Sequence, residues 1–125
     1  MKKQITTPKA PEAIGPYSQA IKINGFIYTS GQIAIVDGKL IEGNAGNQAR
    51  LVMENLKSVL EAAGASFDNV IKTTIFLTEM ADFAEVNKVY DSFMSQPYPA
   101  RETVSVKQLP LNANVEISMV AYIGN

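Results

Sequence analysis

The sequence contains no histidine, no cysteine and no tryptophan among its 125 residues. A disulfide framework needs cysteine, and a structural zinc site needs thiolate or imidazole ligands, so both are excluded. A serine nucleophile normally needs a histidine base, which excludes a conventional catalytic triad as well. Any chemistry must therefore depend on carboxylates, guanidinium or amino groups, hydroxyls and amides.

The charges are balanced and scattered. Eleven basic and twelve acidic residues give a net charge of −1, and the lysines form no block. The electrostatic footprint of a nucleic-acid-binding protein is therefore missing. No segment approaches the ~20 apolar residues of a membrane span, and no apolar run of signal-peptide length follows the first lysines. We expect a soluble, cytoplasmic protein with neither a nucleic-acid nor a membrane partner.

Turn signals and β-branched runs predict most of the strands. Asn24-Gly25 and Asp37-Gly38 each separate two short apolar runs, which is a strong signal for a two-residue hairpin turn. The chain before residue 18 is typical of a loop. Later strands are predicted in "NVIKTTIFLT", "ETVSVKQL" and "VEISMVAYI". On the first of these, one face is expected to carry Ile71, Thr73, Ile75 and Leu77.

Two amphipathic helices complete the predicted fold. Apolar residues recur at steps of three and four over residues 47–63, where Gly64 is placed to end the helix. The same spacing continues over residues 83–93, with Asp82 as the predicted N-cap and two prolines beyond the end. The order of these elements predicts that residues 1–125 form a single α+β domain, with one mixed sheet and both helices on one face.

Arg101 and Glu116 are the strongest candidates for chemistry. Two prolines stiffen the approach to Arg101, and its planar guanidinium suits bidentate recognition of a carboxylate or phosphate, although a surface salt bridge is the simpler alternative. Glu116 lies among apolar strand residues, either as an edge charge that deters aggregation or as a partly buried carboxylate with a raised pKa. Alternation along the last strands predicts that both lie on the sheet face opposite the helices, a mixed face that indicates a subunit interface.

Four further residues are candidates for a site. A Gly-Pro turn aims Tyr17, whose more common fate is packing in a core. Ser30-Gly31 interrupts a strand pattern, where a glycine indicates a bulge or the close approach of another group. Without histidine, Ser30 is a hydrogen-bond donor rather than a nucleophile. Asn87 is either an ordinary polar helix residue or a ligand contact.

Several segments, taken together, resemble the RidA family, also called YjgF/YER057c/UK114. They are "AIGPYSQA", "YTSGQI", "NLKSVLEAAGAS", "VIKTTIFLTEMADFAEVNKVY", "PARETVSVKQLP" and "VEISMVAYI". The resemblance implies a chorismate-mutase-like fold, assembled as a homotrimer with three ligand sites between subunits. It also implies hydrolytic deamination of reactive 2-imino acids, such as 2-iminobutanoate and 2-iminopropanoate, to 2-oxo acids and ammonia. No metal or organic cofactor is implied, and the expected partners are small 2-imino or 2-oxo acids and further copies of the chain.

The resemblance also implies roles for individual residues. Arg101 matches the arginine that pairs with the substrate carboxylate, and Glu116 matches the acid that positions water. Four other residues match positions of the family's cleft. The resemblance implies a catalytic role for Tyr17 and contacts with the substrate for Ser30, Gly31 and Asn87. Hydroxyl or backbone donors near Ser30 and Thr103 are expected to orient the substrate.

Three positions depart from the family pattern and leave the preferred imine open. Glu102 replaces a small residue, Thr103 stands where a cysteine is common, and Ser118 stands where a second acid often follows. Glu102 should point away from Arg101, but at a strand start it has room to swing across and compete for the guanidinium. The main alternative function is a non-catalytic module that binds small carboxylates or a regulatory partner in the same clefts. A ribonuclease is disfavoured by the charge and by the lack of histidine.

Overall fold

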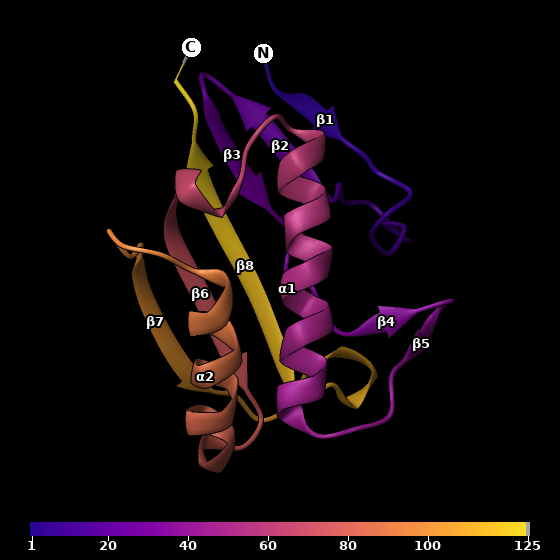
Figure 1. The fold of residues 1–125 in the computed structure, drawn as a ribbon. Coiled ribbons are helices and arrows are strands. Elements are labelled where there is room, and N and C mark those ends of the chain that lie inside the picture. Colours follow the sequence, from indigo (N-terminus) through magenta and orange to yellow (C-terminus); the bar gives the residue numbers. More distant parts are fainter. Residues whose placement is uncertain (125) are drawn as a thin grey trace.

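The computed structural model describes residues 1–124 and shows a six-stranded mixed sheet with two helices on one face (Figure 1). The strand order is β1-β2-β3-β8-β6-β7, in which only β6 and β7 are parallel neighbours. The sheet strands are β1 (Lys3–Ile5), β2 (Ala20–Ile23), β3 (Phe26–Thr29), β6 (Val70–Leu77), β7 (Ala100–Ser105) and β8 (Val115–Tyr122). The helices are α1 (Ala45–Ala62) and α2 (Phe83–Phe93). The predicted α+β architecture is confirmed.

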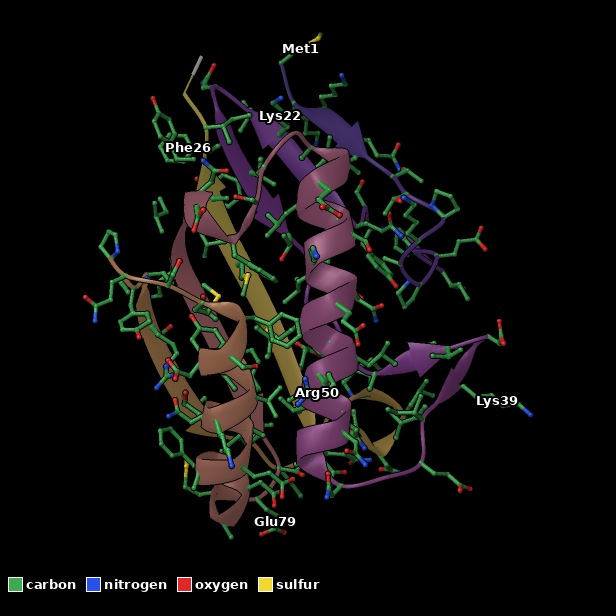
Figure 2. All side chains as sticks on the ribbon, in the orientation of Figure 1. Met1, Lys22, Phe26, Lys39, Arg50 and Glu79 are labelled. Atoms are coloured by element: carbon green, nitrogen blue, oxygen red, sulfur yellow. The ribbon has the colours of Figure 1, made fainter. Side chains whose placement is uncertain are left out.

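Both predicted hairpin turns are present. Asn24 and Gly25 join β2 to β3 with φ values of 50° and 81°, the left-handed conformation that a two-residue hairpin turn requires. Asp37 and Gly38, at 52° and 77°, join β4 (Ile35–Val36) to β5 (Lys39–Leu40) in the same way. This small hairpin stands apart from the main sheet, and Lys39 extends outward from it (Figure 2).

The expectation of a loop at the start of the chain is wrong for one short segment. β1 pairs antiparallel with β2 and forms one edge of the sheet. Only Ile5 of its three residues is buried, so the strand carries too little alternation to be recognised in the sequence.

The two helices are fixed to each other at their N-terminal ends. Asp82 precedes α2, but its side chain makes no capping hydrogen bond, so that part of the prediction is wrong. The acidic side chain that is used is Glu85, whose Oε1 accepts a hydrogen bond from the backbone N–H of Gly46 in the first turn of α1. A Cβ on Gly46 would lie 2.7 Å from that oxygen, so glycine leaves the space that the carboxylate occupies. The predicted end of α1 is confirmed, because Gly64 adopts a φ of 84° directly after it.

The core lies between the helices and the sheet. On β8 every second residue is buried, and the same alternation holds from Thr73 to Leu77 on β6. Ile71 does not join this series as predicted, because the register between β6 and β8 shifts between Val70 and Lys72, and its side chain is exposed. Three short 3₁₀ turns connect the elements, at Phe67–Asn69, Met80–Asp82 and Pro110–Asn112.

The face of the sheet that the helices leave uncovered, here called the open face, is rich in apolar side chains. Tyr28, Val104 and Tyr122 are exposed on it, and the Phe26 ring packs against the Tyr122 ring with centroids 4.7 Å apart. Such a surface is typical of an interaction site. In the part of the chain that the structure describes, neither helix combines the length and hydropathy that a membrane crossing requires.

Candidate functional site

Arg101 lies on the helix side of the sheet, which corrects the predicted face. In the parallel pair of β6 and β7 it lies opposite Thr73, which is fully buried beneath the helices. Its Nη1 donates a hydrogen bond to Oδ1 of Asn87 on α2, at 2.6 Å. The prediction assumed that Val104 faces the helices. Because β7 is an edge strand, Val104 instead lies with Phe76 on the open face, and Arg101 takes the other side.

Three residues of α2 surround the guanidinium. Phe83, Asn87 and Tyr90 are spaced at i, i+4 and i+7, which places them on one face of the helix. The Cζ atom of Arg101 is 5.8 Å from the centre of the Phe83 ring and 5.1 Å from the centre of the Tyr90 ring. Both distances are within the range of cation–π attraction. An adjoining hollow of about 420 Å³ is lined by Asn87, Tyr90, Asp91, Tyr98, Pro99 and Arg101.

Glu116 lies on the open face of β8, opposite Phe76 of β6. Its side chain is half-buried, and this burial raises the pKa of the carboxyl above the ordinary value for glutamate. The carboxylate lies directly against Gly31, where a Cβ would be 2.5 Å from Oε2. The close approach that the glycine predicted is therefore made by Glu116.

Tyr17 and Ser30 lie on the chain segments next to Gly31. The hydroxyl of Ser30 donates to the backbone carbonyl of Ser18, and the Ser30 N–H donates to the carbonyl of Gln19. Both donors of Ser30 are therefore used within the chain, where they hold the loop that carries Tyr17. Tyr17 is 53% exposed, so it does not have the core role that was the more common alternative. Its side chain is available to a ligand or to another copy of the chain.

The three positions that depart from the family pattern, Glu102, Thr103 and Ser118, do not all lie on the same face of the sheet. Thr103 shares the helix side with Arg101, and its buried Oγ1 has no hydrogen-bond partner among residues 1–124. Glu102 and Ser118 lie on the open face, on either side of Thr74. Glu102 accepts a hydrogen bond from Lys72 at 2.7 Å, which lowers the pKa of its carboxyl, so it does not compete for Arg101.

The candidate residues therefore form two groups on opposite faces of one sheet. The arginine half-site consists of Arg101 and its neighbours Phe83, Asn87, Tyr90 and Thr103. The glutamate half-site consists of Glu116, Gly31, Ser30 and Tyr17. Within one chain the sheet separates the two groups, so a small acid bound at Arg101 cannot reach Glu116.

The sequence did not indicate three neighbours of Arg101: the rings of Phe83 and Tyr90, and its strand partner Thr73. The helical spacing over residues 83–93 explained Phe83 and Tyr90 simply as apolar positions of an amphipathic helix. The signal that could have found them is their i, i+7 spacing around Asn87, which was already a candidate ligand contact.

Comparisons with known proteins identify the family. The family model described as "Endoribonuclease L-PSP" matches residues 7–123. The chain belongs to this family, also called YjgF/RidA. A RutC family protein of Pyrococcus horikoshii is 46% identical over 124 residues, covering 98% of each chain. A relative in Mus musculus, named 2-iminobutanoate/2-iminopropanoate deaminase, is 42% identical over 99% of this chain and 93% of its own.

Solved structures of the RidA family have the same fold. The crystal structure of RidA from an Antarctic Psychrobacter is 44% identical to this chain and superimposes with a TM-score of 0.93. That match covers 97% of this chain and 99% of the Psychrobacter chain. The resemblance drawn from the sequence motifs is confirmed.

Proposed function

We propose that the protein hydrolyses 2-imino acids to 2-oxo acids and ammonia in clefts between three copies of the chain. The observation that carries this proposal is the placement of Arg101 and Glu116 on opposite faces of one sheet. A cleft that contains both groups forms when the open face of one copy meets the arginine half-site of the next. The exposed side chains of Tyr28, Val104 and Tyr122 supply apolar surface for that contact. The number of copies, three, comes from the family resemblance.

Arg101 is suited to hold the carboxylate of the substrate. A guanidinium has five N–H donors, and Asn87 occupies one nitrogen, Nη1, with a single hydrogen bond. Donors on the other nitrogens remain for a bidentate pair with the planar carboxylate next to the imine. This pair fixes the position of the imine carbon, which lies one bond from the carboxylate.

Glu116 of the partner subunit is suited to activate water. Burial raises the pKa of this carboxyl toward the working pH, which favours transfer of a proton from water to the carboxylate. The water oxygen adds to the imine carbon while the imine nitrogen takes up a proton, which gives a carbinolamine. Collapse of the carbinolamine breaks the carbon–nitrogen bond, releases ammonia and leaves the 2-oxo acid. Imines already hydrolyse in water without help, so general-base and positioning effects of roughly 10²-fold or more suffice.

Two other functions are less well supported by the residues of the site. The family description names an endoribonuclease, but a net charge of −1 and the absence of histidine offer RNA neither an electrostatic footprint nor the usual base. A non-catalytic module that binds small carboxylates would use the same clefts. The name of the mouse relative favours the deaminase.

The direct test measures release of 2-oxo acid and ammonia from freshly generated 2-iminobutanoate and 2-iminopropanoate. We expect release to accelerate with protein concentration. Binding of 2-oxobutanoate without any acceleration would support the non-catalytic module instead and would overturn the proposed activity.

Subunit complementation tests the shared cleft. Arg101→Ala and Glu116→Gln chains should each be inactive alone, whereas coexpressed chains should regain activity, because some clefts combine intact Arg101 with intact Glu116. Random assembly in equal amounts makes about a quarter of the clefts intact. The control coexpresses wild-type chains with the Arg101→Ala/Glu116→Gln double variant, which also leaves about a quarter of clefts intact. If the paired single variants stay inactive while this control is active, the cleft is not shared between chains.

A further inference from the structure

The side chain of Arg101 is held by more than its hydrogen bond to Asn87. An arginine side chain has several rotatable bonds, and on an edge strand an exposed arginine has space to sample many rotamers. Here the guanidinium lies within 5.1 Å of the centre of the Tyr90 ring. Tyr90 is 5% exposed, so the ring is a fixed surface on the interior side of the guanidinium.

Tyr90 is itself held from below by the sheet. Its hydroxyl donates a hydrogen bond to Oγ1 of Thr73 at 3.0 Å, and Thr73 has no exposed surface. Thr73 is also the residue of β6 that lies opposite Arg101 in the parallel register. The three residues thus form a closed triangle of one strand pairing, one hydrogen bond and one cation–π contact. Burial raises the pKa of the Tyr90 phenol, so its hydroxyl stays protonated and remains a donor at neutral pH.

We propose that Tyr90, anchored by Thr73, is a positioning residue that fixes the Arg101 guanidinium in the orientation that receives a substrate carboxylate. The inference rests on the proposed role of Arg101 in carboxylate binding. It assigns Tyr90 no contact with the substrate. The ring and its anchor reduce the conformational freedom that Arg101 would otherwise lose when the ligand binds. Removing either should weaken carboxylate binding with Arg101 itself intact.

The first experiment measures binding of 2-oxobutanoate by calorimetry, which reports on Arg101 without requiring turnover. We expect Tyr90→Leu to raise the dissociation constant about tenfold, because the cation–π contact and the fixed surface are both lost. Phe93→Leu is the matched control. Phe93 is another aromatic residue of α2, but its ring packs against Phe67. This variant should lose stability and keep the wild-type dissociation constant.

A second pair of variants isolates the anchor. Tyr90→Phe keeps the ring and removes the hydroxyl, and Thr73→Val keeps the shape and removes the acceptor. We expect each to weaken 2-oxobutanoate binding about two- to fivefold, because the ring gains freedom when its hydrogen bond is lost. The double variant should be no worse than either single variant, since both remove the same hydrogen bond.

Further measurements in the Arg101→Ala background separate positioning from a general loss of structure. If Tyr90 acts through Arg101, Tyr90→Leu should not weaken the residual 2-oxobutanoate binding of the Arg101→Ala protein any further. Wild-type affinity in a folded Tyr90→Leu protein, or in Tyr90→Phe if the first variant does not fold, would overturn the positioning role. Wild-type affinity in Arg101→Ala itself would instead overturn the proposed carboxylate clamp, and the positioning role with it.

Discussion

The carboxylate of Glu116 occupies the space that a side chain at Gly31 would need. A Cβ on Gly31 would lie 2.5 Å from Oε2 and 2.7 Å from Cδ of Glu116, closer than non-bonded atoms approach. These two residues come from chain segments far apart in the sequence, yet each limits what the other can be. Gly31 therefore sets the position of the carboxylate in the glutamate half-site.

Gly31→Ala should move the Glu116 carboxylate and lower activity. The added methyl group must displace the end of a flexible side chain rather than the backbone, so we expect the fold to persist. We expect kcat/KM for 2-imino acids to fall at least tenfold, because a displaced base loses its water. Steady-state kinetics check this value, and denaturant unfolding checks the fold. Adding Gly31→Ala to Glu116→Gln should cause little further loss; a large additional loss would mean that Gly31 acts on something other than Glu116.

Arg101→Ala should impair carboxylate binding and leave the fold intact. Loss of charge-assisted hydrogen bonds costs about 1.5 to 3 kcal/mol each, so we expect kcat/KM for 2-imino acids to drop at least tenfold. Arg101→Lys should restore only part of this loss, because an ammonium keeps the charge but has no planar fork. Near-wild-type kcat/KM in a folded Arg101→Ala protein would reduce the residue to a surface charge.

The pH dependence of kcat/KM should contain an acidic limb that belongs to Glu116. Activity needs the ionised carboxylate, and burial raises its pKa, so as the pH falls activity should be lost at a higher pH than an ordinary glutamate would give. Glu116→Gln should bind 2-oxo acids and lose both turnover and this limb. Retention of the limb in the glutamine variant would assign it to another group.

The same raised pKa makes stability depend on pH in the opposite direction to activity: stability falls as the pH rises. Between the ordinary pKa of glutamate in the unfolded chain and the raised pKa in the folded chain, the folded state binds more protons. The Glu116 contribution to the free energy of unfolding is therefore largest at low pH and is lost as pH rises through that window. Denaturant unfolding at several pH values should show this loss in the wild type and not in Glu116→Gln.

The contact between Glu85 and Gly46 should stabilise the fold without taking part in catalysis. Glu85→Ala leaves a backbone N–H at the start of α1 without its carboxylate partner, and we expect the free energy of unfolding to fall by about 1 to 2 kcal/mol. Gly46→Ala should destabilise the protein as well, because its Cβ would displace the same carboxylate. Glu12→Ala, which removes an exposed acid elsewhere on the chain, is the control. A stability equal to that of Glu12→Ala would show that the Glu85 contact contributes nothing.

The sequence was sufficient for both helices and for every strand of the main sheet except β1, and it was insufficient for the face that Arg101 occupies. Turn dipeptides and helical periods are local signals, and they predicted both hairpins and both helices correctly. The face of β7 depends on a non-local fact, namely that the strand is an edge and need not direct its valines toward the helices. Val104 therefore lies on the open face, and Arg101 lies on the helix side, opposite to the face predicted from the alternation of residues. The same kind of fact, a register shift beside Val70, turned Ile71 outward.

Sequence reasoning singled out Arg101, Glu116 and Gly31 but predicted neither their arrangement nor the aromatic neighbours of Arg101. Arg101, Glu116 and Gly31 stand out because each is unusual in its local pattern. No local pattern reports that the sheet lies between Arg101 and Glu116, because strand order and register decide it. Tyr90 was expected only as an apolar position of the second helix, and its ring is buried. Its contact with the guanidinium became visible only when α2 was placed beside β7.

The location of the two half-sites on opposite sides of the sheet makes every contact between copies directional. In the proposed trimer, the helix side of one copy meets the open face of the next, so each contact creates one complete cleft. A closed ring of three copies has as many clefts as contacts, and opening one contact leaves an unmatched arginine face at one end and an unmatched glutamate face at the other. The activity of a sample would then be proportional to the number of contacts formed between copies rather than to the number of folded chains.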